Sequence, residues 1–226
     1  MIDRTSMEDL MKHELRDGDT FAFECRMCGK CCRGRDDDPI VLTGADVFRA
    51  ARLLKISTAE FINRYCRIHL GPQSHCPVVT LRAKSHMGAC PLLKDGKCSI
   101  QSDKPAVCAI FPLGRWYDPK EEKWHYFTQG ETCEGCRASK RWTAKEWTGN
   151  FNMEEANRYA AAFDRLVSEI APFMRNTPLE KISSERADIM AALLYAGFRY
   201  DEGAPSYEEQ IEERIGRFRE IAKILG

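Results

Sequence analysis

Hydrophobic residues in the C-terminal part of the chain recur with the spacing of a helix. Apolar side chains lie three and four positions apart from Phe163 to Met174, and charged side chains occupy most positions between them. Such spacing puts the apolar side chains on one face of a helix, which we expect to end near Asn176. A second helix is predicted from Leu179 to an end between Gly197 and Gly203, and a third from Ser206, whose hydroxyl can cap the first turn. We interpret the apolar faces as packing surfaces of a helical layer, and a partner-binding helical arm is the alternative.

The first part of the chain contains shorter apolar stretches separated by Gly, Pro and Cys. Thr43 and Ser57 stand at helix starts, where each hydroxyl can bond a backbone amide three residues later, and they predict helices over 44–54 and 58–68. Turn residues between β-branched and aromatic runs predict a strand over 78–81 and two hairpins, which turn at Asp95-Gly96 and across 118–123. The expected fold class is therefore α+β, a small cysteine-rich module with short helices and hairpins followed by a mainly helical C-terminal region.

Cysteine usage divides the chain in the same way. All eleven cysteines lie between Cys25 and Cys136, and the residues after Cys136 contain none. We therefore predict an N-terminal segment over 1–20, a cysteine-cluster metal-binding module over 21–137 and a helical C-terminal region over 138–226.

The charge balance argues against several classes of partner. The 34 Lys+Arg and 34 Asp+Glu residues give a formal net charge of zero, so the general electrostatic signature of a nucleic-acid binder is absent. The longest nearly unbroken apolar run, Ile189–Phe198, is too short to span a bilayer, and neither a nucleic-acid nor a membrane partner is expected. The start of the chain is rich in charge and lacks the apolar stretch of a secretory signal, so we expect a cytoplasmic protein. In that reducing compartment, clustered thiols hold metal more often than they form disulfides.

The segment Cys25–Cys32 contains the strongest motif in the chain. Two successive C-x2-C steps let a short loop direct Cys25, Cys28 and Cys31 to one centre, and Gly29 permits the positive φ that such a loop needs. The spacing is similar to the ligand run of bacterial ferredoxins, except that Cys32 follows Cys31 at once. Because adjacent side chains point in different directions, one of these two thiols is expected to serve a second centre or to support the first.

Five further cysteines stand at turns or element ends, where the backbone is free enough for ligation. The predicted metal ligands are Cys25, Cys28, Cys31, Cys32, Cys90, Cys98, Cys108, Cys133 and Cys136, enough for two four-ligand sites with one thiol over. Cys66 is assigned to the core, because a free cysteine is among the most buried residue types. Cys76 stays open, as does the neighbouring His75, which could be a ligand or a solvated loop residue.

Positions along the whole module match one family pattern. They are Phe23, Cys25, Cys28, Gly29, Cys31, Cys32, Leu42, Thr43, Asp46, Cys90, Leu92, Gly96, Cys98, Ile100, Pro105, Cys108, Phe111, Pro112, Cys133 and Gly135. On these residues the chain resembles the YkgJ-type cysteine-cluster family of zinc- or iron-chelating CxxCxxCC domains. Two positions depart from the pattern, since Lys104 and Ala109 stand where the family often has Arg. The resemblance implies a metal centre, often an iron–sulfur one, and no particular reaction.

The thiolate ligands narrow the cofactor to two alternatives. Soft sulfur favours Zn²⁺ or an iron–sulfur cluster over hard cations. The C-x2-C-x2-C run favours a [4Fe–4S] cluster in a redox, sensing or accessory role. Two C-x2-C knuckles, Cys25/Cys28 and Cys133/Cys136, could instead close a structural zinc site in a protein-interaction module without redox activity. Phosphate-binding, dinucleotide-binding and radical-SAM motifs are missing from the sequence, so a catalytic role has little support and a non-enzymatic metal-binding role is favoured. An unidentified protein partner is expected.

Overall fold

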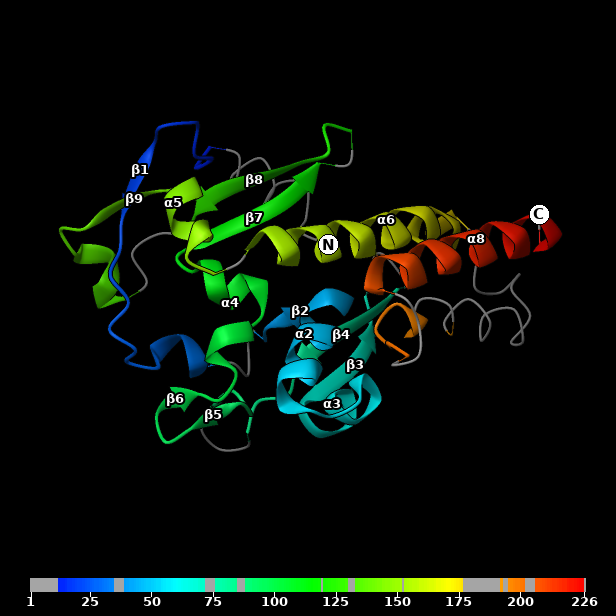
Figure 1. The fold of residues 1–226 in the computed structure, drawn as a ribbon, viewed down its shortest axis with the longest axis horizontal. Helices are drawn as coiled ribbons and strands as arrows, with labels where there is room; N and C mark the ends of the chain where they lie inside the picture. The colour runs from blue at the N-terminus through cyan, green and yellow to red at the C-terminus, as the bar shows by residue number, and fades with distance from the viewer. Residues whose placement is uncertain are drawn as a thin grey trace. The chain divides into compact units, whose positions relative to one another are not determined.

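The computed structural model describes residues 12–34, 39–71, 76–84, 88–118, 120–129, 133–151, 153–176, 192, 195–201 and 206–225. The described chain is α+β, with short helices, small antiparallel sheets and a helical C-terminal region, which confirms the predicted class (Figure 1). It forms two compact units. Unit 1 combines residues 41–82 with those from Ala156 onward, and unit 2 combines the residues up to Ile40 with 83–155. The predicted boundary between residues 137 and 138 does not coincide with a boundary between these units.

Within the described residues, unit 1 contains a three-stranded antiparallel sheet and the helices α2, α3, α6 and α8. The strand order is β2-β4-β3, so the central strand is β4, the last of the three along the chain. The elements are β2 (Val41–Leu42), α2 (Gly44–Leu54), α3 (Thr58–Tyr65), β3 (Cys66–Leu70), β4 (Pro77–Leu81), α6 (Met153–Asn176, which begins just before the unit) and α8 (Tyr207–Leu225). Strand β4 confirms the strand predicted over 78–81.

Capping side chains start α2 and α3 as predicted. The Thr43 hydroxyl accepts the Asp46 N–H at 3.1 Å, and the Asp46 carboxylate accepts the Thr43 N–H at 3.0 Å. Ser57 accepts the Glu60 N–H at 3.1 Å. The predicted helix over 58–68 is too long, because α3 ends at Tyr65 and the next five residues pair with β4 instead. Backbone pairing with a strand that comes later in the chain therefore overrides the local helical pattern.

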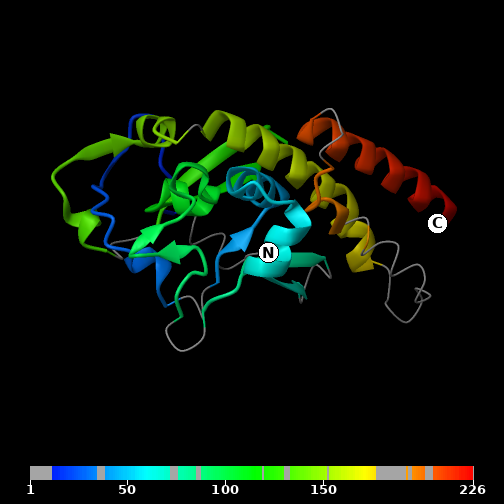
Figure 2. The same cartoon turned by 60° about the horizontal axis from the view of Figure 1, so that its bottom comes forward.

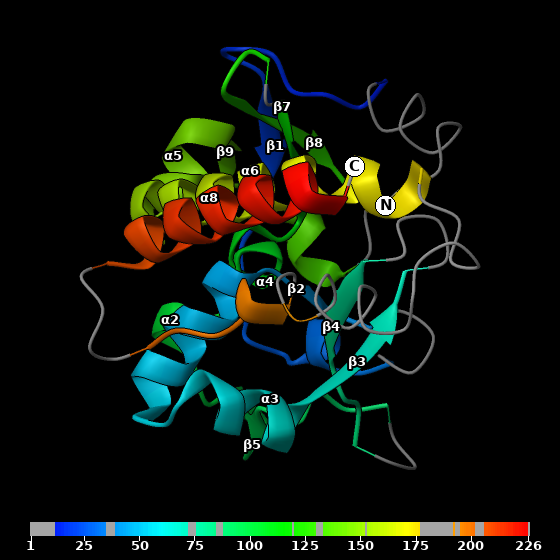
Figure 3. The same cartoon turned by 90° about the vertical axis from the view of Figure 1, so that its right-hand side faces the viewer.

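Helices α6 and α8 lie side by side in all views (Figure 1, Figure 2, Figure 3). The rings of Phe173 and Phe218 meet edge to face with centroids 6.0 Å apart, and Arg219 pairs with Glu169 at 2.6 Å. The Ser206 hydroxyl accepts the Glu209 N–H at 3.1 Å, which confirms the predicted start of the third helix. Most of the helix predicted from Leu179 lies outside the described residues. None of the described helices has the length and apolar character needed to cross a membrane.

Unit 2 is built from three two-stranded pairs and short helical turns. The predicted hairpins at Asp95-Gly96 and across 118–123 are confirmed by β5–β6 and β7–β8. The elements are β1 (Thr20–Ala22), η1 (Lys30–Cys32), β5 (Leu93–Lys94), β6 (Lys97–Cys98), η2 (Gln101–Asp103), α4 (Ala106–Ile110), β7 (Leu113–Asp118), β8 (Lys123–Thr128), η3 (Glu134–Arg137), β9 (Arg141–Thr143) and α5 (Ala144–Gly149). Strand β1 pairs with β9, so the two ends of the unit meet.

Aromatic side chains form the core of unit 2. Trp147 is buried and meets the rings of Phe21 and Phe23 edge to face, with centroids 6.4 and 5.1 Å away. Its indole N–H donates to the carbonyl of Ile110 at 2.9 Å, and the Trp142 indole donates to the carbonyl of Phe23 at the same distance. Each large apolar ring thus also satisfies its one polar atom. These contacts fix the segment that enters the cysteine-rich loop.

Candidate metal centre

The structure separates the eleven cysteines into two sets. The nine predicted ligands all belong to unit 2, and Cys66 and Cys76 belong to unit 1. Both thiols of unit 1 are buried. In unit 2, Cys25, Cys28 and Cys31 are exposed, and Cys90 and Cys136 are buried. The candidate centre is therefore confined to one unit.

The adjacent pair Cys31 and Cys32 lies beside Cys90 and Cys98. The Cys90 N–H donates to the carbonyl of Cys32 at 2.8 Å, which ties the CxxCxxCC loop to the chain before β5. A hydrogen bond with the Cys31 side chain, burial, and the nearby Cys31, Cys90 and Cys98 thiols all raise the pKa of Cys32. Four thiols that come from three parts of the chain thus interact around Cys32. A metal ion bound by Cys32 would oppose this shift, because a coordinating thiol is deprotonated outright.

The cysteine loop takes its shape from a left-handed glycine. Gly29 has a φ of 70° and directly precedes the single turn η1 that carries Cys31 and Cys32. Only glycine enters this region without steric cost. The Arg33 side chain donates to the carbonyl of Cys28 at 3.2 Å and closes the loop on itself. The loop therefore has a defined conformation built from its own residues.

Cys133 and Cys136 form a second close pair at η3. Their sulfur atoms are 4.0 Å apart. Burial raises the pKa of Cys133, while the backbone amides of Gly135 and Cys136 donate toward its sulfur and oppose that effect. Two thiolates bound to one tetrahedral zinc at about 2.3 Å would lie about 3.8 Å apart. The pair thus already has nearly the separation that a single zinc ion requires.

The C-x-G-C turn of Cys133–Cys136 packs against the start of the CxxCxxCC loop. The Glu24 N–H donates to the carbonyl of Gly135 at 3.0 Å. A Cβ on Gly135 would lie 2.6 Å from the Glu24 carbonyl oxygen, so only glycine permits this approach. Lys30 and Glu134 also form an ion pair at 3.2 Å. The last predicted ligands are thereby placed next to Cys25, over a hundred residues earlier in the chain.

Amide groups also point at Cys90. Burial raises the pKa of this thiol, and the backbone amides of Leu92 and Leu93 donate to its sulfur and lower it again. Hydrogen bonds to sulfur stabilise thiolate ligands and tune the potential of iron–sulfur clusters. Sequence reasoning missed these donors, although the Cys-Pro-Leu-Leu stretch at the start of a hairpin could have indicated them.

The predicted ligands of the described residues do not gather at a single point. Cys108 lies in α4 and is half-buried. Among the residues that the structure describes, no three cysteine sulfurs lie within 4.8 Å of one another. The nine-residue ligand set as a whole stays a prediction, and the contacts single out two parts of it, the group around Cys32 and the Cys133–Cys136 pair.

Cys66 lies in the core of unit 1 as predicted. Its exposed fraction is 6%, and burial raises the pKa of the thiol to about 12 despite the nearby Arg82. Cys76 is buried as well, and His75 lies outside the described residues. Cys66 is thus a buried core thiol of unit 1, whereas all nine predicted ligands belong to unit 2.

Comparison with known proteins gives one match. No curated protein and no solved structure matches the chain. The CxxCxxCC family model, described as a putative zinc- or iron-chelating domain, matches residues 24–141, more than half of the chain. The matched range includes all nine predicted ligands and begins one residue before the first of them. The chain therefore belongs to the CxxCxxCC family of zinc- or iron-chelating domains.

Proposed function

We propose that this protein holds an iron–sulfur cluster, of the [4Fe–4S] type, through cysteine thiolates of unit 2. The observation that supports this most is the group around Cys32, where Cys31, Cys90 and Cys98 all interact with one thiol. A four-iron cluster takes one thiolate on each of four irons, so its ligands need not converge on a single point. Four interacting thiols from three chain segments suit that requirement.

The amide donors around Cys90 support the same proposal. Leu92 and Leu93 each direct a backbone N–H to the Cys90 sulfur. Such donors offset the negative charge that a cluster places on its ligands, and they raise its reduction potential. A cluster held in this way would act in electron transfer, in sensing, or as an accessory to a modifying enzyme. A reducing cytoplasm, where thiols stay free for ligation, is the proposed location.

A zinc-stabilised module is the second candidate, and the Cys133–Cys136 pair favours it. The 4.0 Å separation of these sulfurs is close to that of two thiolates on one tetrahedral zinc. Cys25 and Cys28 would complete a closed four-thiolate site, since the η3 turn packs against the residue before Cys25. A closed site of this kind is structural. The protein would then serve as an interaction module for a protein partner.

Metal and sulfide analysis of anaerobically purified protein separates the two candidates. About four iron and four acid-labile sulfide per chain, with a broad visible absorption that dithionite bleaches, is the expected result for a [4Fe–4S] centre. Colourless protein with tightly held zinc and no sulfide would contradict the cluster and support the interaction module. A Cys90→Ser variant serves as the site control. It should lose the iron and sulfide and leave any zinc at Cys133 and Cys136 in place.

A further inference from the structure

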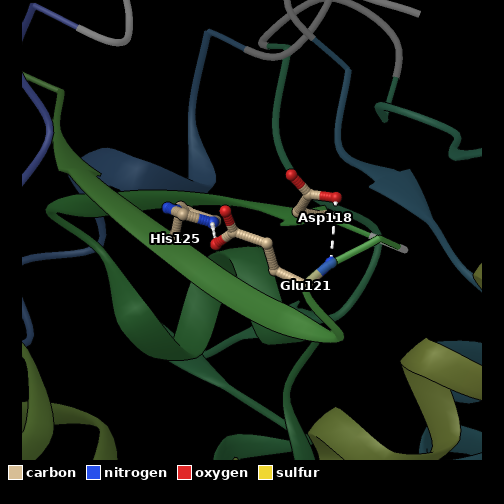
Figure 4. Close-up of side chains that lie close together, drawn as sticks. All are labelled: Asp118, Glu121 and His125. Atoms are coloured by element: carbon tan, nitrogen blue, oxygen red, sulfur yellow. Dashed lines mark hydrogen bonds and ion pairs between the residues drawn. The ribbon is translucent and has the colours of Figure 1, made fainter.

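A second group of ligand-type side chains lies on the β7–β8 hairpin of unit 2. Asp118 ends β7, Glu121 lies in the turn and His125 lies on β8 (Figure 4). Each contributes one ligand atom, and the three atoms lie within 4.8 Å of one another. Among the described residues, no other group of three or more His, Cys, Asp and Glu side chains has its ligand atoms this close together. It contains no cysteine and is separate from the thiols described above.

His125 is held in a fixed orientation. Its ring stacks on Trp116 with centroids 4.2 Å apart and an interplanar angle of 9°. The side chain is 12% exposed, and its Nδ1 atom is 2.5 Å from a carboxylate oxygen of Glu14. A carboxylate on one ring nitrogen is the usual support for a metal-binding histidine, because it fixes the tautomer that leaves the other nitrogen free to ligate.

The other ring nitrogen faces a carboxylate without bonding to it. Nε2 is buried, has no hydrogen-bond partner, and lies 3.7 Å from Oε2 of Glu121. That distance is too long for an N–H···O hydrogen bond. Two ligand atoms bound to one ion at about 2.1 Å lie about 3 to 3.6 Å apart. In the tautomer whose Nδ1 donates to Glu14, the lone pair of Nε2 and the carboxylate of Glu121 face each other at a separation that suits two ligands of one cation.

The turn also orients the third carboxylate. Oδ1 of Asp118 accepts the Lys120 N–H at 2.7 Å and the Glu121 N–H at 3.4 Å, so the hairpin turn itself holds the side chain (Figure 4). Glu121 is 62% exposed, which leaves a path from solvent to the group. Three carboxylates, including Glu14, surround one imidazole here, and a divalent cation would relieve their mutual repulsion.

We infer that Asp118, Glu121 and His125 bind a divalent first-row transition ion such as Mn²⁺ or Fe²⁺, and that Glu14 is a positioning residue for His125. Imidazole and carboxylate ligands suit these ions, whereas thiolates select zinc, copper(I) and iron–sulfur clusters. Three protein ligands leave further coordination positions for water or another ligand. The site is thus expected to be open and exchangeable, unlike a closed thiolate site.

Mn²⁺ binding to the full-length protein, followed by the electron paramagnetic resonance of the free ion, tests the inference. Mn²⁺ is the suitable probe because thiolates bind it poorly. The expected result is one Mn²⁺ per chain, with affinity at least tenfold weaker in Glu121→Gln. Glu122→Gln is the matched control, since it removes the same charge from the next residue of the same turn. It should stay within twofold of the wild type.

Glu14→Gln tests the positioning role. It should weaken Mn²⁺ binding about 10- to 100-fold, as loss of a supporting carboxylate does at other sites, and Mn²⁺ should no longer broaden the ring signals of His125 in the NMR spectrum. Absence of stoichiometric Mn²⁺ binding in the wild type would overturn the site, as would equal weakening by Glu121→Gln and Glu122→Gln. Acid-labile sulfide and zinc contents measured on the same samples should not change, so this result and that of the thiol sites are read separately.

Discussion

The cysteines of unit 2 and those of unit 1 carry the same side chain among different neighbours. In unit 2 the thiols stand on turns and at element ends, they approach one another, and backbone amides donate to Cys90 and Cys133. In unit 1 Cys66 and Cys76 are buried among the core residues. The two groups differ in the neighbours of their thiols and not in burial, because Cys90 and Cys136 of unit 2 are buried as well. The number of cysteines therefore overstates the size of a metal site, and their surroundings define it.

Serine substitutions test the difference between the two groups of cysteines most directly. Cys31→Ser is expected to abolish loading of the proposed cluster, and Cys28→Ser to abolish loading of the alternative zinc site. Each should destabilise unit 2, because metal binding and folding are coupled in small metal-binding domains. Cys66→Ser should retain the full metal content while losing about 1 to 3 kcal/mol of unfolding free energy, since it buries a hydroxyl without a partner. Elemental analysis and urea unfolding measure the two effects. Equal metal loss in all three variants would overturn the division into ligand and core thiols.

The next largest effect is expected at Gly135, where a close approach inside unit 2 depends on a missing side chain. Gly135→Ala places a Cβ 2.6 Å from the carbonyl oxygen of Glu24 and should cost about 1 to 3 kcal/mol through overpacking. The control is Gly149→Ala at the end of α5, where a Cβ meets nothing within 4 Å. It should be neutral or stabilising by about 0.4 to 1 kcal/mol. Thermal unfolding and metal content of both variants check this pair, and similar losses in both would refute the role of Gly135.

The features that the sequence predicted well are local ones. Thr43 and Ser57 cap their helices through contacts three residues away, and the Asp95-Gly96 turn closes a hairpin between neighbouring residues. The core position of Cys66 also followed from its apolar neighbours. The family pattern placed all nine candidate ligands in one matched region. In each case the information lies within a few residues or within a fixed motif.

The features that were missed depend on pairing between distant segments. Residues 66–70 continue a helical pattern in the sequence, but they form β3 because β4 offers a backbone partner. Residues 41–82 interrupt the cysteine-rich sequence yet group with the C-terminal helices, since cysteine usage reflects chemistry and not packing. The contact of His125 with Glu14 joins residues 111 positions apart. Spacing along the chain carries no signal for such contacts.

The raised pKa of Cys66 should make the stability of the protein depend on pH in the alkaline range. Burial raises this pKa to about 12 in the folded protein, while the pKa of a cysteine in an unfolded chain is about 8.5. Between these two pH values the folded state binds more protons than the unfolded state. The contribution of this thiol to the unfolding free energy is therefore complete below about pH 8.5 and is lost as the pH rises toward 12. Cys66→Ala should flatten the decline of unfolding free energy across that range. Parallel curves for wild type and variant would contradict the assignment.

The smallest expected effect concerns the ion pair between Lys30 and Glu134, which joins the two cysteine-bearing turns of unit 2. The two side chains are 58% and 69% exposed, and their charged atoms are 3.2 Å apart. Exposed pairs contribute about 0.2 to 1 kcal/mol and weaken with salt. Lys30→Gln should therefore lower the unfolding free energy by no more than this, with the difference vanishing at high salt and the metal content unchanged. Loss of metal in Lys30→Gln would instead mean that the ion pair positions Cys31 next to the η3 turn. Backbone contacts such as that between Glu24 and Gly135 would then not be sufficient to hold the two turns together.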